Sequence, residues 1–461
     1  MAGEPIARHA DGENVVTQTN SSSGQPLRRM GLGTATALVV ASMVGTGVFT
    51  TTGLLVPLIP SAGAILECWT IGGLAALCGA LSYAELGAAL PHNGGEYRFL
   101  HELMHPAVAF LSAWISLIVG FAAPLAALAL GFGSYFAVFV PGTPPWLSGG
   151  LVVLVLSVLH VWRVSAGSRV QNVLTVGKVV LILGFVVAGV GRGSWALLAV
   201  AGPKPLLATV GSPGFAVGLL LVSFAYTGWN AAAYVGGEVE QPTRVLPRAL
   251  LLGAGGVMVL YLALNVVFLM AAPLGDLSGQ VAVGHVAAER LLGSIGGKLV
   301  SAVIAAGLVS TIGAIIVTGP RVYEAVGHDV PRLGWLARRS AEGGPTVAIA
   351  LQTALALGMM ASAGFEALLT YVGFTIAVFS AVSVSCVFLL RRRPEIVMPF
   401  RAPGYPLTPL LYVALMAWMV VDGIRERPVA ALAGAATVLC GLGVYFGMRP
   451  RAAGGAAAGP P

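Results

Sequence analysis

Twelve apolar segments follow one another along the chain, and they constrain the fold more than any other feature of the sequence. They lie at about residues 32–58, 63–90, 106–140, 146–163, 169–196, 213–237, 247–273, 298–323, 345–363, 366–390, 406–424 and 428–448. Most of these runs are long enough to cross the hydrocarbon core of a bilayer as helices. Only 9% of the residues are charged, whereas a soluble domain has about 25%. The sequence therefore predicts an all-α polytopic membrane protein.

Positive charge is distributed unevenly between the connections that join these segments. With the N-terminus in the cytoplasm, most of the 25 lysines and arginines fall in cytoplasmic connections, as the positive-inside rule requires. We therefore expect a multi-pass protein of the cell membrane with both termini cytoplasmic. A disordered tail is predicted over residues 1–30, a transmembrane domain over 31–449 and a second disordered tail over 450–461. This topology accounts for the net charge of +7, so the expected surroundings are the lipid bilayer and not nucleic acid.

The first apolar segment contains a motif that does not suit the centre of a helix. Gly45 and Gly47 are one residue apart, and glycine is a poor helix former. Backbone that is not helical at membrane depth survives only where protein buries it or where it lines a cavity. Thr46 and Gly47 would then begin a second half-helix, whose free N–H groups and positive dipole end suit a carboxylate. Close packing of helices through small residues is the alternative explanation.

A second motif of this kind lies in the sixth apolar segment, where residues 224–230 read Phe-Ala-Tyr-Thr-Gly-Trp-Asn. Paired broken spans, each the first of a five-span unit, are typical of transporters built from inverted repeats, with the substrate site at the membrane midplane. The pair therefore favours a transport site over simple packing.

Several further stretches occur in a characteristic order. Together with the two broken segments they are Gly45–Phe49, Ser82–Leu86, Gly94–Tyr97, Arg169–Asn172 with Lys178, Phe224–Asn230, Glu238 with Pro242, Arg244, Leu246 and Pro247, and Arg391–Glu395. In this order the chain resembles the amino acid, polyamine and organocation superfamily of permeases, and within it the L-type amino acid transporter group. The resemblance implies the leucine-transporter fold, with twelve transmembrane helices arranged as two inverted repeats of five plus two. It also implies secondary active transport of amino acids by alternating access, without a cofactor.

The resemblance implies where an amino acid would bind. Its carboxylate would meet the backbone around Thr46 and Gly47. Its amino group would meet carbonyl groups near Met43, Phe224 and Thr227, and the ring of Phe224 would act as a gate on the extracellular side. The complete set of expected substrate-binding residues is Met43, Gly45, Thr46, Gly47, Phe224, Ala225, Tyr226, Thr227, Gly228, Trp229 and Asn230.

Lys178 lies deep in an otherwise apolar span. A lysine at the membrane centre costs about 2.5–3.5 kcal/mol on insertion scales and usually serves a function. In several proton-coupled or exchanging members of the resembled family, a lysine of span five fills the place of a sodium ion, and Lys178 matches it. Ser310 and Thr311 in span eight would be the alternative, as oxygen ligands of sodium. We expect Lys178 to be the proton-coupling residue and transport to be independent of sodium, with symport and exchange both open.

The expected pocket has no acidic partner for a cationic substrate. Spans one, three, six, eight and ten have no carboxylate near their centres, and Glu366 lies close to an outer end. Burying a cationic side chain without a partner is costly. Neutral amino acids are therefore the expected substrates.

Two other classes of protein fit parts of the sequence. His101, Glu102 and His105 form the HExxH pattern of zinc proteases, with Asp422 as a possible third ligand. Pro106 disrupts the helix that must carry both histidines, which argues against a metal site and an enzyme. A permease-like sensor that binds an amino acid without moving it is the second alternative.

Two expectations concern contacts outside the substrate site. Eukaryotic members of the resembled group are joined to a single-pass glycoprotein through a cysteine after span three, but residues 140–146 contain no cysteine, so no disulfide-linked heavy-chain partner is expected. Charged residues at the inner ends of spans suggest an ion-pair latch between the connections after spans two and six. The candidates are Glu85, Glu96, Glu238, Glu240, Arg244 and Arg248.

Overall fold

The structure is a computed structural model that describes residues 30–162, 167–199, 210–329, 331–339 and 345–448. Helices make up almost all regular structure in these ranges. They are α1 (Leu32–Met43), α2 (Gly47–Leu55), α3 (Ala62–Ala89), α4 (Gly95–Leu103), α5 (Pro106–Ile115), the π-helix η1 (Ser116–Ala122), α6 (Ala123–Phe136), α7 (Pro145–Trp162), α8 (Gly167–Arg192), α9 (Trp195–Ala199), α11 (Pro213–Ala225), α12 (Ala231–Tyr234), the 3-10 helix η2 (Gly236–Glu238), α13 (Pro242–Ala271), α14 (Leu274–Leu277), α15 (Val283–Asp329), the 3-10 helix η3 (Pro331–Ala337), α16 (Thr346–Ser362), α17 (Phe365–Leu390), α18 (Leu407–Glu426) and α19 (Pro428–Met448). The predicted tails, 1–30 and 450–461, lie outside the described residues except for Met30.

The prediction of an all-α, multi-span membrane protein is confirmed. Within the described ranges, eight helical segments are long and apolar enough to cross a membrane, and three shorter apolar helices accompany them. Large apolar side chains on the outer helices are exposed, among them Leu151 on α7 and Val187 on α8. A bilayer would cover such side chains with lipid, which explains why they do not need a protein partner.

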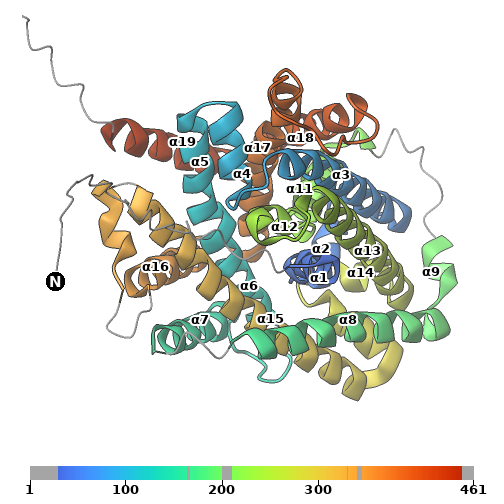
Figure 1. Ribbon diagram of the computed structural model, residues 1–461. Coiled ribbons are helices and arrows are strands. Elements are labelled where there is room, and N and C mark those ends of the chain that lie inside the picture. The colour runs from blue at the N-terminus through green and yellow to red at the C-terminus, as the bar shows by residue number, and fades with distance from the viewer. Residues whose placement is uncertain (1–29, 163–166, 200–209, 330, 340–344, 449–461) are drawn as a thin grey trace, which may run out of the picture.

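The first broken segment lies in the middle of the molecule. Figure 1 looks nearly along α1 and α2, with α3, α6, α11, α12, α13, α15 and α17 around them. Helices α7, α16 and α19 lie farther out. Helix α1 packs against α13, α2 packs against α11 and α15, and α3 packs against α13. A chain segment that lies among other helices can be irregular at membrane depth, because its polar backbone groups find partners other than lipid.

Span eight is longer than predicted. The predicted range 298–323 is the central part of α15, which begins at Val283 and ends at Asp329. The helix bends at Gly293, whose φ of 77° is in the left-handed region that glycine adopts readily. Gly284, before this bend, and Phe49 of α2 both bond to the Tyr135 hydroxyl, as described below.

Candidate functional site

The first break occurs where the glycine motif predicts it. Helix α1 ends at Met43 and α2 begins at Gly47. Between them the Gly45 N–H bonds back to the Met43 carbonyl at 2.8 Å, and the Phe49 N–H bonds to the Thr46 carbonyl at 2.8 Å. The first N–H groups of any helix have no partner within it, so the start of α2 presents backbone donors at this point.

The second break separates α11, which ends at Ala225, from α12, which begins at Ala231. Gly228 has a φ of 97°, a conformation that a side chain would strain. Both the N–H and the hydroxyl of Thr227 donate to the Phe224 carbonyl, at 3.0 and 2.7 Å. This predicted ligand for a substrate amino group is therefore already engaged within the break.

The two breaks lie against each other. A Cβ added to Gly47 would stand 2.4 Å from the Ala225 Cα, and one added to Gly228 would stand 2.6 Å from the Ser42 carbonyl oxygen. Helix α1 contacts α12 while α2 contacts α11, so the broken segments run antiparallel. Packing thus explains Gly47 and Gly228. Gly45 differs, because its nearest neighbour would be the Met43 carbonyl oxygen at 3.9 Å.

Thr46 gives the first break a polar side chain without a protein partner. The residue is 1% exposed, and its Oγ1 has no hydrogen-bond partner among the described residues. Burying a hydroxyl in this way is costly unless something binds it. A Cβ on Gly131 of α6 would lie 3.1 Å from the Thr46 Cγ2 and 3.6 Å from the Phe365 ring of α17. Sequence analysis missed Gly131 and Phe365, which the fold brings to Thr46.

Lys178 of α8 reaches the first break. Its Nζ donates to the Val44 carbonyl at 3.0 Å and to the Thr311 Oγ1 of α15 at 3.1 Å. The side chain is 5% exposed, and its stem lies against Gly307, where an added Cβ would stand 2.9 Å from the lysine Cγ. The amine thus lies between the unwound part of span one and span eight.

Four of the remaining predicted residues are held by contacts with the surrounding helices or connections. The Met43 carbonyl accepts from the Tyr261 hydroxyl at 2.6 Å, and the Tyr226 hydroxyl donates to the Trp69 carbonyl at 3.1 Å. The Trp229 ring packs edge-on against Tyr83 with centroids 4.8 Å apart. The Asn230 amide donates to Glu96 at 2.8 Å. The side chains of Tyr226, Trp229 and Asn230 thus brace the second break.

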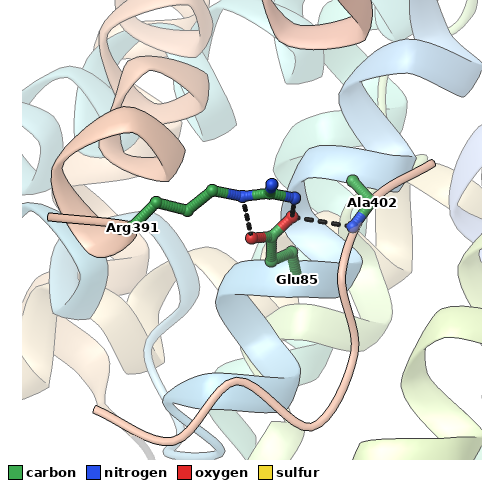
Figure 2. Close-up of polar contacts among 3 residues, drawn as sticks. All are labelled: Glu85, Arg391 and Ala402. Atoms are coloured by element: carbon green, nitrogen blue, oxygen red, sulfur yellow. Dashed lines mark hydrogen bonds and ion pairs between the residues drawn. The ribbon is translucent and has the colours of Figure 1, made fainter. Parts of the chain in front are cut away.

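The ion-pair latch has a different partner from the one predicted. Glu85 at the end of α3 is fully buried and receives two hydrogen bonds from Arg391, at 2.7 and 2.9 Å, and one from the Ala402 N–H at 2.7 Å (Figure 2). The Arg391 guanidinium also lies 3.7 Å above the Tyr405 ring. The pair therefore connects span two to the end of span ten, and not to Arg244 or Arg248 after span six.

The two sides of the breaks differ in access. Every residue of α2 is buried, and the Tyr135 hydroxyl donates to the Phe49 carbonyl at 2.7 Å and accepts from the Gly284 N–H at 3.2 Å. The Gly279 N–H bonds to the Gly53 carbonyl at 2.8 Å. On the other side, Ser42 of α1 is exposed. The α2 side of the first break is thus fully buried, whereas the α1 side has an exposed residue next to the break.

The HExxH pattern is divided between two helices. His101 belongs to α4, whereas His105 is the N-cap of α5 and accepts from the Ala107 N–H at 3.1 Å. The helix ends between them, so the histidines do not share a helical face. In the part of the chain that the structure describes, no group of three or more potential ligands could hold a metal ion.

Comparison with known proteins identifies the family of the chain. Residues 30–447 match the amino acid permease family. The serine/threonine exchanger SteT of Bacillus subtilis is 30% identical, over 92% of this chain and 98% of its own length. The large neutral amino acids transporter small subunit 2 of Mus musculus is 27% identical, over 95% of this chain and 85% of its own length. The human b(0,+)-type amino acid transporter 1 is 26% identical, over 97% of this chain and 93% of its own length.

Proposed function

The chain belongs to the amino acid permease family and is an amino acid transporter and not an enzyme, and on this premise we propose that it exchanges neutral amino acids by alternating access, independently of sodium. The fold that we propose is the leucine-transporter fold with twelve transmembrane helices. Helix α8 and the three short apolar helices then complete the set formed with the eight longer segments.

One observation carries the proposal: the Lys178 amine donates hydrogen bonds to the Val44 carbonyl in the first break and to the Thr311 hydroxyl. An ammonium group at this point offsets the partial negative charge at the carbonyl end of α1, as a bound sodium ion otherwise would. Because Thr311 is one of the two candidate sodium ligands, the amine competes directly with the ion. This supports sodium-independent transport.

The surroundings of Thr46 support an uncharged substrate. Its free hydroxyl and the first N–H groups of α2 are donors suited to a carboxylate. Gly131 and Phe365, which lie beside Thr46, offer an apolar boundary without charge. The names of two relatives refer to serine/threonine exchange and to large neutral amino acids. Exchange is therefore preferred over proton symport in this proposal.

The proposed setting is the cell membrane with both termini in the cytoplasm, because this orientation puts most arginines on the cytoplasmic side. We further propose that the chain works without a disulfide-linked heavy chain, since residues 140–146 contain no cysteine. In this orientation the exposed part of α1 faces the cytoplasm.

The test is uptake into proteoliposomes that contain the purified protein. Vesicles loaded with unlabelled serine or leucine should take up the same labelled amino acid much faster than empty vesicles. Replacing external sodium with choline should leave the rate unchanged. A vesicle preparation without protein, loaded in the same way, is the control for leakage.

Three results would contradict the proposal. Uptake that needs sodium would overturn the role given to the lysine. Equal rates in loaded and empty vesicles would overturn exchange. Binding of labelled amino acid without any uptake would indicate the sensor alternative.

A further inference from the structure

A second polar cavity lies apart from the two breaks. It has a volume of about 460 Å³ and is enclosed by α7, the second half of α15, the residues after η3 and the start of α16. Its walls are His160, Ile316, Val317, Arg321, Glu324, Arg339, Pro345 and Ile349. Neither the amino acid site nor the lysine contact involves any of these residues.

Positive charge predominates at this cavity. Arg321 is exposed and forms no ion pair within the described ranges, whereas Arg339 is bound to the buried carboxylate of Glu324. Two guanidinium groups therefore face one carboxylate. The ring of His160 is held by its Nδ1, 2.7 Å from the Leu156 carbonyl oxygen. Guanidinium groups suit phosphate, because their planar array of donors matches its oxygens.

The other walls are apolar and continue onto the membrane-facing surface. Ile316, Val317, Pro345 and Ile349 contribute hydrocarbon to the cavity. On α7, the residue before His160 is Leu159, which is 53% exposed on a helix whose outer face is covered with exposed apolar side chains. A ligand with an anionic head and a hydrocarbon tail could place its head on Arg321 and its tail along this face.

We propose that this cavity binds the phosphate headgroup of an anionic phospholipid. Basic pockets between transmembrane helices on the cytoplasmic side are suited to such headgroups, and the proposed topology puts the ends of α7 and α15 on that side. The volume is within the range of small-molecule sites and accommodates a headgroup but not two acyl chains, which lie outside on α7. Arg321 is the principal phosphate ligand, Arg339 is the second, and Glu324 opposes binding through its charge.

The experiment measures thermal unfolding of the full chain in detergent. Dioleoyl phosphatidylglycerol should raise the unfolding midpoint in a saturable way, because a ligand that binds only the native state stabilises it. Dioleoyl phosphatidylcholine has the same chains without net charge and should raise it much less. Inorganic phosphate supplies the charge without the chains and should also have little effect.

Three variants separate a specific site from general attraction. Arg321→Gln should weaken phosphatidylglycerol binding about fivefold, the loss of one arginine near the lipid. Arg393→Gln removes an equal charge from an exposed arginine elsewhere and should leave binding unchanged. Glu324→Gln should strengthen binding, because it removes the opposing carboxylate and releases Arg339. The midpoint of each variant without lipid shows whether it is folded.

Several outcomes would overturn the proposal. Equal stabilisation by the two lipids would mean that the charge is not recognised. Stabilisation by inorganic phosphate as large as that by phosphatidylglycerol would assign the cavity to a soluble anion. Equal losses of phosphatidylglycerol binding in Arg321→Gln and Arg393→Gln would mean that the overall charge of the protein, and not this cavity, determines the binding.

Discussion

At the scale of single residues, Lys178 is the most informative position. Lys178→Ala should reduce amino acid exchange at least tenfold, because it leaves the Val44 carbonyl and the Thr311 hydroxyl without the cation that they contact. Initial rates of uptake in proteoliposomes measure this effect. Lys298→Ala removes an exposed lysine and serves as the control. Full exchange activity in Lys178→Ala would contradict the assignment.

Gly45 and Gly47 are expected to serve different purposes. Gly45→Ala adds a methyl group at the proposed carboxylate site without a clash, its nearest neighbour being 3.9 Å away, so substrate affinity should fall while thermal stability stays near that of the wild type. Gly47→Ala drives a methyl group into Ala225 and should lower the free energy of unfolding by about 1–3 kcal/mol. Affinity and thermal stability are measured for both variants. Unchanged affinity in Gly45→Ala would assign both glycines to packing.

Sequence predicted the positions of the breaks better than the directions of their side chains. Two glycines inside an apolar run are a local signal, and the helix ends beside them. The hydroxyl of Tyr226 and the ring of Trp229 bind to α3 instead of facing the first break. A helix that is apolar all round gives no periodic signal for the direction of one side chain, so this part of the site was not predictable.

At the scale of elements, the Glu85–Arg391 pair connects α3 to the end of α17. Arg391→Ala leaves a fully buried carboxylate without its charged partner and should lower the free energy of unfolding by about 3–5 kcal/mol. Arg392→Ala changes the exposed neighbour and should cost little. Thermal unfolding of the two variants in one detergent measures the difference, and equal midpoints would mean that the pair contributes nothing.

Helix α4 and the residues before it hold the second break from one side. Gly94 donates to the Tyr234 carbonyl at 3.0 Å, Asn93 accepts from the Gly237 N–H at 2.9 Å, and Asn230 donates to Glu96. Burial raises the pKa of the Glu96 carboxyl, although the hydrogen bond from Asn230 favours its charged form. Glu96 therefore holds a proton in the folded protein at a pH where the unfolded chain has released it.

The sign of the resulting pH dependence follows from this raised pKa. The contribution of Glu96 to stability is greatest below the ordinary pKa of a glutamate and is lost as the pH rises through the raised value. The unfolding midpoint of the wild type, relative to Glu96→Gln, should therefore fall as the pH rises. Glu238→Gln alters an exposed carboxyl and provides the control. A difference that is constant with pH would refute the assignment.

Contacts between distant elements were the hardest to predict. Arg391 lies 306 residues from Glu85. The hydropathy of the sequence does not indicate which connections between helices contact each other in the fold. The twelve apolar segments and the order of the motifs did suffice for the family. Gly131 and Phe365 gave no signal of their own, because a glycine and a phenylalanine in apolar spans look like ordinary packing residues.

At the scale of the whole molecule, the two sides of the first break differ in burial, because α2 is buried throughout and Ser42 of α1 is exposed. In a variant without its native cysteines, Ser42→Cys should react with a water-soluble thiol reagent that is added from the proposed cytoplasmic side, because Ser42 is exposed. Thr50→Cys should stay unreactive, since every residue of α2 is buried. Mass spectrometry of the labelled protein measures both. Faster labelling of Thr50→Cys would indicate that the opposite side is open.

The contact of Lys178 with the first break bears on the energetics of transport. A sodium ion enters with the substrate and leaves on the other side, so each cycle dissipates part of an electrochemical gradient. An ammonium group of the protein itself stays with the protein throughout the transport cycle. It dissipates no electrochemical gradient unless it releases its proton. If the proton stays, the concentration ratios of the exchanged amino acids alone set the direction of net flow, and the accumulation of one is limited by the outflow of another.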